Sequence, residues 1–181
     1  MDNMQFTDLC SRAWNLPLLA ALNAGCPARV SPLAAHLGAG RTSVGASFEH
    51  LQQLGLICRT PGHGHPLRPE FMLTEQGHSV AQWAGALSAR TPIESWPSLR
   101  KTWTLPILRL LNQQQRFGEL RSALSPITDR ALSLSLKELS ACNWAQRCVD
   151  PAQSPPQVSY SATGFGAAIQ PELAQSFSIA I

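Results

Sequence analysis

The segment WNLPLLAALN at residues 14–23 recurs as WTLPILRLLN at residues 103–112, and this repetition governs the interpretation of the whole chain. Six positions carry the same residue in both copies, at a constant spacing of 89. Self-similarity at a fixed spacing is the sequence signature of a repeated structural unit. We therefore expect two copies of one fold in this chain of 181 residues.

Further matches follow on the C-terminal side of these segments, at spacings of 87, 88 and 89. The spacing changes only between predicted elements, where loops tolerate insertions. The repeat predicts two domains, residues 1–90 and residues 91–181. The matched pairs are Arg29 and Arg116, Leu33 and Leu120, Leu37 and Leu124, Ser47 and Ser135, Leu51 and Leu139, Arg59 and Arg147, Thr74 and Thr163, and Gly77 and Gly166.

The first helix of each unit is predicted from a proline that follows a capping residue. Asn15 and Thr104 can each cap a helix in which Pro17 or Pro106 occupies the first turn, where proline removes no helical hydrogen bond. We expect these helices to end near Gly25 and Gln113, with a second short helix at 31–38 and at 116–125, where leucines recur four residues apart.

A third helix is predicted to begin at Thr42 or Ser43 in the first unit and at Thr128 or Asp129 in the second. Two short helices joined by a tight turn form a helix-turn-helix motif. The predicted buried faces are Val44, Phe48 and Leu51 in the first unit, and Leu132, Leu136 and Leu139 in the second.

Residues 56–74 and 145–163 each read as a strand, a loop rich in proline and glycine, and a second strand. Three helices followed by such a hairpin make a winged helix. The expected fold class is therefore α+β, mainly α, with two tandem winged helix-turn-helix domains arranged as an intramolecular pseudo-dimer. Between them, an amphipathic helix should bury Val80, Trp83 and Leu87 and break at Pro92 and Pro97.

Composition indicates an ordinary globular chain, because 44% of residues are apolar and the formal net charge is only +3. The five cysteines form no C-x-x-C pair, so we expect no metal site, no cofactor and a reducing compartment. The chain shows neither a secretion signal nor a membrane-spanning run of apolar residues, which predicts a cytoplasmic protein. No catalytic arrangement can be argued from the spacing of residues, so we do not expect an enzyme.

The second unit resembles the HxlR-type winged-helix regulators of bacteria. The resemblance rests on KTWTLPIL at 101–108, RFGELRSAL at 116–124, the run through Ile127, Arg130, Leu132 and Ser133, and PPQVSYSATGFG at 155–166. It implies a sequence-specific transcriptional regulator that binds double-stranded DNA, usually as a homodimer of one-module chains. Here one chain would act as a monomeric pseudo-dimer, or two chains would form a homodimer.

This chain departs from the family pattern in its third helices. Leu134 and Ser135 stand where the family carries polar or cationic residues, and the first unit has Gly45, Ala46 and Ser47 in this stretch. A further departure is Asn143, which replaces a glycine before the first wing strand. Arg, Asn and Gln are the side chains that usually form hydrogen bonds with bases, and these helices carry few of them. We therefore expect few direct hydrogen bonds between these helices and bases.

The predicted DNA-binding residues lie at the starts of the third helices, along their exposed faces and on the wings, where helix amides and cations can meet phosphates and base edges. They are Arg41, Thr42, Ser43, Gly45, Ala46, His50, Arg59, His63, His65, Arg68, Thr128, Arg130, Ser133, Lys137 and Arg147.

Several readings remain open at this point. His63 and His65 fit turn chemistry and phosphate contact, or a metal, although no third ligand is close in sequence. Cys10 fits a buried apolar residue or a redox-sensing thiol. The whole chain could instead be a winged-helix protein-interaction module, or a regulator that senses a small-molecule effector in a pocket between the modules, around Trp83 and Trp96.

Overall fold

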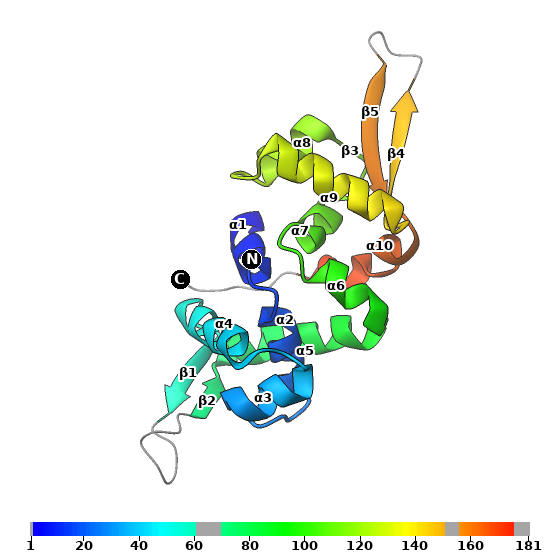
Figure 1. The fold of residues 1–181 in the computed structure, drawn as a ribbon. Helices are drawn as coiled ribbons and strands as arrows, with labels where there is room; N and C mark the ends of the chain where they lie inside the picture. The colour runs from blue at the N-terminus through cyan, green and yellow to red at the C-terminus, as the bar shows by residue number, and fades with distance from the viewer. Residues whose placement is uncertain (1, 61–69, 151–155, 176–181) are drawn as a thin grey trace. The chain divides into compact units, whose positions relative to one another are not determined.

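The computed structural model describes residues 2–60, 70–150 and 156–175 and shows a mixed α and β chain in which helices predominate (Figure 1). Internal contacts divide the chain into two units. In the described part, unit 1 comprises Arg12–Arg100, and unit 2 combines Asp2–Ser11 with Lys101–Gln175.

Unit 1 places three helices before an antiparallel hairpin, and a long helix follows. Helix α2 is apolar over most of its surface and packs against both α4 and the long helix α5. The elements in order are α2 (Asn15–Asn23), α3 (Val30–Leu37), α4 (Arg41–Gln53), β1 (Ile57–Thr60), β2 (Glu70–Leu73), α5 (Glu75–Arg90), η1 (Ile93–Ser95) and α6 (Trp96–Leu99).

The core of unit 1 confirms the predicted apolar faces. Val44, Phe48 and Leu51 on α4 are buried, and the Phe48 ring stacks on Phe71 of β2 with centroids 4.2 Å apart. Apolar positions three and four residues apart on a helix share one face, so these residues meet the same neighbours. On α5 the predicted buried residues Val80, Trp83 and Leu87 are likewise buried.

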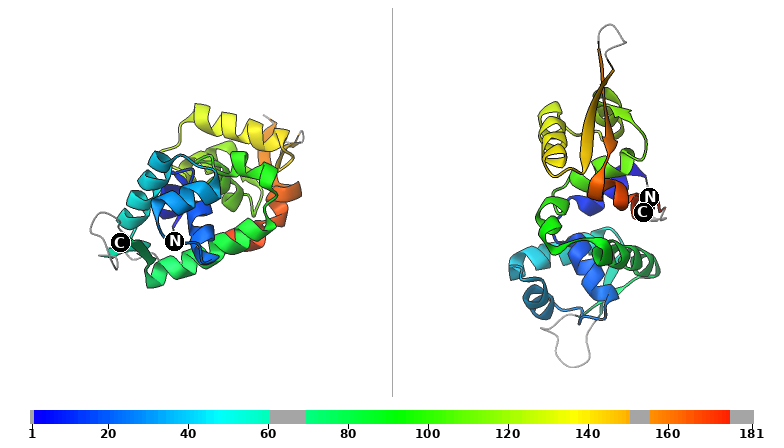
Figure 2. Two further views of the ribbon diagram at one scale, coloured as in Figure 1. Left: turned by 60° about the horizontal axis from the view of Figure 1, so that its bottom comes forward. Right: turned by 90° about the vertical axis from the view of Figure 1, so that its right-hand side faces the viewer.

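Unit 2 repeats this order and adds a short third strand. Its sheet has the order β3-β5-β4, with all pairings antiparallel, and the β4–β5 hairpin projects away from the helices of this unit (Figures 1 and 2). The elements are α1 (Asn3–Cys10), α7 (Thr104–Leu110), β3 (Gln115–Arg116), α8 (Phe117–Ala123), α9 (Asp129–Ala141), β4 (Ala145–Asp150), β5 (Gln157–Ala162), α10 (Gly164–Ala168) and α11 (Gln170–Leu173).

The core of unit 2 forms around α7, whose residues Leu105, Ile107 and Leu108 are completely buried. Helix α9 turns its predicted apolar face, Leu132, Leu136 and Leu139, to the inside. Helices α1 and α11 also pack against α7, so this short helix is enclosed by segments from both ends of the sequence. The order of helices and hairpin is consistent with a winged helix-turn-helix.

The end of each hairpin is anchored by the same close approach of glycine to a carbonyl. The amides of Thr74 and Thr163 donate to the carbonyl oxygens of Leu56 and Trp144, each at 3.0 Å. A Cβ atom on Gly77 would overlap the Leu56 oxygen, and one on Gly166 would overlap the Trp144 oxygen. Glycine is therefore required at both positions by packing, not by its dihedral angles.

Three predicted caps are wrong. Asn15 and Thr104 are buried first-turn residues, and Trp14 and Trp103 occupy the N-cap positions without a side-chain cap bond. Helix α4 begins at Arg41, one residue earlier than expected, because the extended Gly40 is its N-cap and neither Thr42 nor Ser43 caps it. Only the expected cap of α9 at Thr128 is confirmed: its hydroxyl oxygen accepts from the Ala131 amide at 3.2 Å.

The predicted boundary between residues 90 and 91 differs from the division by contacts. Helix α1 belongs to unit 2, whereas η1 and α6 belong to unit 1. Residues 3–10 and 92–99 are separated by 89 positions, and each segment precedes a helix whose N-cap is a tryptophan, Trp14 or Trp103. Pro92 ends α5 as expected, but Pro97 lies in the first turn of α6 instead of breaking a helix.

Candidate nucleic-acid interface

The solvent-facing side of α9 carries four side chains in a row. Arg130, Ser133, Leu134 and Lys137 are all exposed, and they follow one another at helical spacings of three, one and three residues. Residues at such spacings share one face of a helix, so this face, hereafter the α9 face, lies opposite the buried leucines. Leu134 has 53% of its surface exposed, so this face also offers an apolar side chain to a partner.

The two cations of the α9 face have no counter-ion in the part of the chain that the structure describes. Neighbouring cations of unit 2 do: Arg121 pairs with Asp129, and Lys101 Nζ lies 2.8 Å from Glu138 Oε1. These pairs occupy both acidic residues of α9, which leaves Arg130 and Lys137 as the uncompensated charges on this helix. Exposed, unpaired cations create a local positive potential suited to an anionic partner.

The wing of unit 2 adds Arg147, which is exposed on β4 and faces Tyr160 in the register of the hairpin. The neighbouring Gln146 Nε2 donates to Ser161 Oγ at 3.1 Å across the same pair of strands. Thr128, predicted to contact a phosphate, uses its hydroxyl oxygen as the cap of α9. Its hydroxyl hydrogen is not committed by that bond, because an N-cap oxygen acts as acceptor.

In unit 1, the structure places the corresponding residues of α4 differently. Arg41, Thr42 and Ser43 are exposed in its first turn, as predicted, and Gly45 and Ala46 are half-buried on the next one. His50 is half-buried, and its ring Nδ1 lies 2.8 Å from Nδ2 of Asn15 on α2. The prediction that His50 lies on the open face of α4 is therefore wrong, because this histidine joins α4 to the core.

Glu49, which the sequence reading passed over, is exposed on α4 instead. Aligning the buried faces of the two helices, Phe48 with Leu136 and Leu51 with Leu139, places Glu49 at the position of Lys137. The register of buried residues was the signal that could have found it. The open face of α4 thus carries a negative charge where the α9 face carries a positive one.

The wing of unit 1 is described only at its base. Arg59 is exposed on β1, and nearby Arg29 forms an ion pair with Glu70 at the start of β2. The other predicted residues of this wing, His63, His65 and Arg68, lie outside the described residues.

Three other properties can be examined in the described residues: metal binding, membrane spanning and redox sensing by Cys10. No group of three or more His, Cys, Asp or Glu side chains there is arranged to hold a metal ion. No helix in them is long and apolar enough to cross a membrane. Cys10 is buried, and this burial raises the pKa of its thiol well above the ordinary value of 9.0, which disfavours the thiolate that redox sensing requires.

Comparison with known proteins extends the description of unit 2. A model of the HxlR-like helix-turn-helix family matches residues 98–178. The chain is 40% identical over 78 residues to YvaP of Bacillus subtilis (strain 168), named as an uncharacterized HTH-type transcriptional regulator; the match covers 42% of this chain and 71% of that protein.

Two further relatives carry the same kind of name. The chain is 39% identical over 66 residues to YybR of Bacillus subtilis (strain 168), and 38% identical over 76 residues to sll1512 of Synechocystis sp. (strain ATCC 27184 / PCC 6803 / Kazusa). These matches cover 36% and 41% of this chain, and 52% and 56% of the relatives, so the chain spans about half the length of each. On its match to the family model and its identity with most of YvaP, the chain belongs to the HxlR-like helix-turn-helix family.

Proposed function

We propose that this protein is a sequence-specific, DNA-binding transcriptional regulator in which the α9 face of unit 2 enters the major groove of duplex DNA. The observation that carries the proposal is the α9 face itself, with Arg130 and Lys137 exposed and unpaired beside Ser133 and Leu134. The relatives named as HTH-type transcriptional regulators support it. No catalytic role is proposed.

Each residue of the α9 face has a chemistry that suits the groove. A guanidinium at the position of Arg130, in the first turn of the helix, can donate two parallel hydrogen bonds to O6 and N7 of a guanine. The exposed Leu134 can contact the methyl group of a thymine, and Ser133 can donate to a base or a phosphate. Lys137 and the wing residue Arg147 would contact the DNA backbone.

We further propose that unit 1 is a second, diverged copy of the same winged helix-turn-helix module. The matched anchors at Gly77 and Gly166 support this, since both approach the backbone carbonyl that follows the third helix. In this copy Arg41, Thr42 and Ser43 would meet phosphates, and Arg59 with the rest of its wing, His63, His65 and Arg68, would follow the backbone. Glu49 opposes DNA at the centre of the helix, so unit 1 would contribute affinity and little sequence readout.

With two modules in one chain, a single polypeptide would bind a DNA site that family members usually bind as a homodimer of one-module chains. Non-identical modules would read a non-palindromic site, with α9 setting the specific half. Such a regulator would act in the cytoplasm, because bacterial DNA lies there. A homodimer remains the alternative assembly, and mass measurement on the DNA complex distinguishes one chain per duplex from two.

The test measures binding of the purified chain to a preferred duplex, selected from random DNA, by fluorescence anisotropy at fixed salt. Arg130→Ala is expected to cost about 1–3 kcal/mol and to relax the choice of base at one position of the site. Lys101→Ala is the matched control, because this exposed lysine of unit 2 is paired with Glu138 and lies off the α9 face. It should leave the base preference unchanged and lower the affinity less than Arg130→Ala does, because its only effect on α9 is to free the charge of Glu138.

Three results would contradict the proposal. If random DNA yields no preferred sequence, unit 2 does not read bases. If Arg130→Ala and Lys101→Ala weaken binding equally, the attraction is a general effect of positive charge. A chain that binds no duplex even at low salt would instead favour the protein-interaction reading of the fold.

A further inference from the structure

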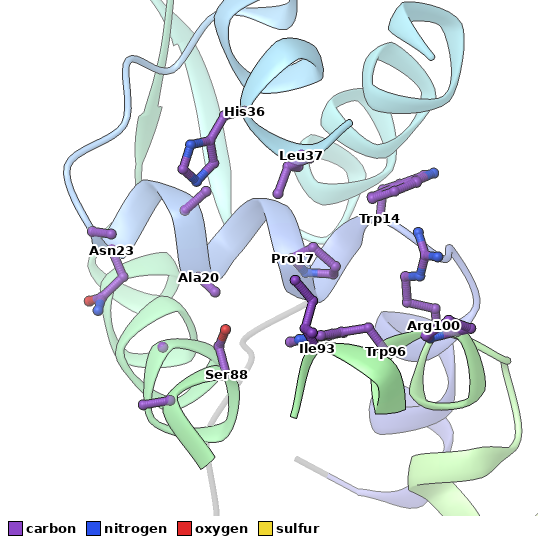
Figure 3. Close-up of a pocket in the computed structure, with 15 residues that line it drawn as sticks. Trp14, Pro17, Ala20, Asn23, His36, Leu37, Ser88, Ile93, Trp96 and Arg100 are labelled. Atoms are coloured by element: carbon purple, nitrogen blue, oxygen red, sulfur yellow. The ribbon is translucent and has the colours of Figure 1, made fainter. Parts of the chain in front are cut away.

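A cavity of about 610 Å³ lies within unit 1, between α2, α3, α5 and α6 (Figure 3). Sites for small molecules commonly measure roughly 300–1,000 Å³. This cavity differs from the expected pocket between the modules around Trp83 and Trp96, because Trp83 is only 2% exposed and does not line it. Trp96 does line the cavity, together with Trp14, and every lining residue belongs to unit 1.

The lining is mostly apolar but its charged members are all basic. Pro17, Ala20 and Ala21 of α2 form part of the wall, and their small side chains leave room beside the helix. The indole rings of Trp14 and Trp96 provide flat aromatic surfaces. Among the described residues, Arg100 and His36 are the only charged or titratable side chains in the lining, and none of these lining residues is acidic. Such a cavity suits a planar apolar body with a negative charge.

The Arg100 side chain is held against Trp14, but its buried Nε has no hydrogen-bond acceptor among the described residues. Its guanidinium carbon lies 4.1 Å from the centre of the Trp14 ring, and Figure 3 shows the side chain directed toward that ring. Its Nε is buried and has no hydrogen-bond partner among the described residues. A guanidinium stays charged at any physiological pH, and a buried N–H without a partner is costly. A carboxylate in the cavity would accept from Nε and from one terminal nitrogen together.

The corresponding positions of unit 2 lack this chemistry. Thr7 and Ser11 stand 89 positions before Trp96 and Arg100, and both belong to unit 2. The ring of Trp96 and the cation of Arg100 thus have no counterpart in the other copy of the proposed repeat, although Trp103 matches Trp14. Unit 1 thus combines a negative charge on the open face of α4 with a basic cavity, whereas unit 2 carries its uncompensated cations on the α9 face.

We propose that this cavity is a binding site for a small aromatic carboxylate. The carboxylate pairs with Arg100, and the ring system lies along α2 against Trp14 and Trp96. The site is separate from the α9 face, and its occupancy is measured without DNA. Failure of this inference therefore leaves the proposed regulator function untouched, and the reverse also holds.

The experiment titrates the full chain with 1-naphthoate, and in parallel with 1-naphthamide, its neutral counterpart, by isothermal calorimetry. The carboxylate should bind at one site per chain, and the amide about tenfold more weakly or not at all, because only the charged group forms strong bonds with a guanidinium. In protein labelled with 5-fluorotryptophan, the fluorine signals of Trp14 and Trp96 should move on binding while that of Trp144 stays.

Two variants locate the site. Arg100→Gln should weaken binding of 1-naphthoate by about tenfold. Ala20→Phe fills the cavity from α2 while leaving Arg100 in place, so it should abolish binding by exclusion. Arg12→Gln is the matched control, because it removes an exposed arginine of unit 1 that lies outside the lining. This control should bind 1-naphthoate like the wild type. Circular dichroism checks that each variant is folded.

Equal binding of 1-naphthoate and 1-naphthamide would overturn the role of Arg100. No binding of either compound to the wild type, or binding that Ala20→Phe leaves intact, would overturn the site. Movement of the Trp144 signal in place of those of Trp14 and Trp96 would place the compound elsewhere and reject the assignment.

Discussion

At the scale of single residues, Asn143 shows how a departure from a family pattern can be physically conservative. The sequence placed asparagine where the first unit has Gly55, and the structure gives both residues positive φ angles, 56° and 68°. Asparagine is among the few side chains that tolerate this left-handed conformation. The change therefore keeps the turn between α9 and the wing.

Asn143→Val is expected to lower the free energy of unfolding by about 1–2 kcal/mol, because a β-branched residue is strained at positive φ. Asn143→Gly should be neutral or slightly stabilising. Equilibrium urea unfolding measures both. Equal destabilisation by the two substitutions would mean that the asparagine side chain, and not its backbone conformation, matters here.

Cys10 leads to a prediction about pH. Burial raises the pKa of its thiol in the folded chain, and the unfolded chain releases this proton near the ordinary pKa of 9.0. The free energy of unfolding is therefore unaffected well below pH 9 and falls as pH rises above it.

Cys10→Ala should remove about 1 kcal/mol of the loss in stability between pH 8 and pH 10. The comparison uses the difference between the two pH values, so the packing cost of the substitution cancels. Cys58→Ala, at an exposed thiol, is the control and should retain the wild-type difference. Identical pH profiles for the wild type and Cys10→Ala would show that the buried thiol does not govern alkaline stability.

At the scale of elements, the two third helices begin differently. Thr128 caps α9 through its hydroxyl, whereas α4 starts after Gly40 without any side-chain cap. Thr128→Ala should therefore cost about 1 kcal/mol of stability, and Ser43→Ala, in the first turn of α4, only a few tenths. Thermal unfolding of both variants checks this difference. A loss with Ser43→Ala as large as that with Thr128→Ala would reveal a cap that the backbone geometry does not show.

Helix α1 gives a second prediction at this scale. Its residues Phe6, Leu9 and Cys10 are buried in unit 2, where α1 packs against α7. Leu9→Ala should cost about 2–5 kcal/mol, since it leaves a cavity in a completely buried position. Hydrogen exchange should show the lost protection in α7 and not in α2, although α2 is closer in sequence. Lost protection confined to α2 would contradict the assignment of α1 to unit 2.

At the scale of the whole molecule, sparse charge limits how the protein can bind DNA. The net charge is only +3, so attraction must come from a few placed cations and not from a general positive surface. Each phosphate contact adds about −0.9 to the slope of log binding constant against log salt concentration. Lys137→Ala should make the slope shallower by about one unit. An unchanged slope would mean that Lys137 does not contact a phosphate.

The sequence by itself determined the three helices before each hairpin, the helix after the first hairpin, the hairpins and the faces that they bury, because these follow from local spacing of apolar residues and from turn-forming residues. It also predicted Arg130, Ser133 and Lys137, which share one helix face by spacing alone. It did not predict α1, β3 or α6. Only the tertiary structure placed His50 against Asn15, joined α1 to unit 2 and brought Arg100 onto Trp14. These contacts join residues 35, 94 or more, and 86 positions apart, and no periodic pattern encodes which distant surfaces meet. Their free energy comes from packing between elements, which becomes defined only when the chain has folded.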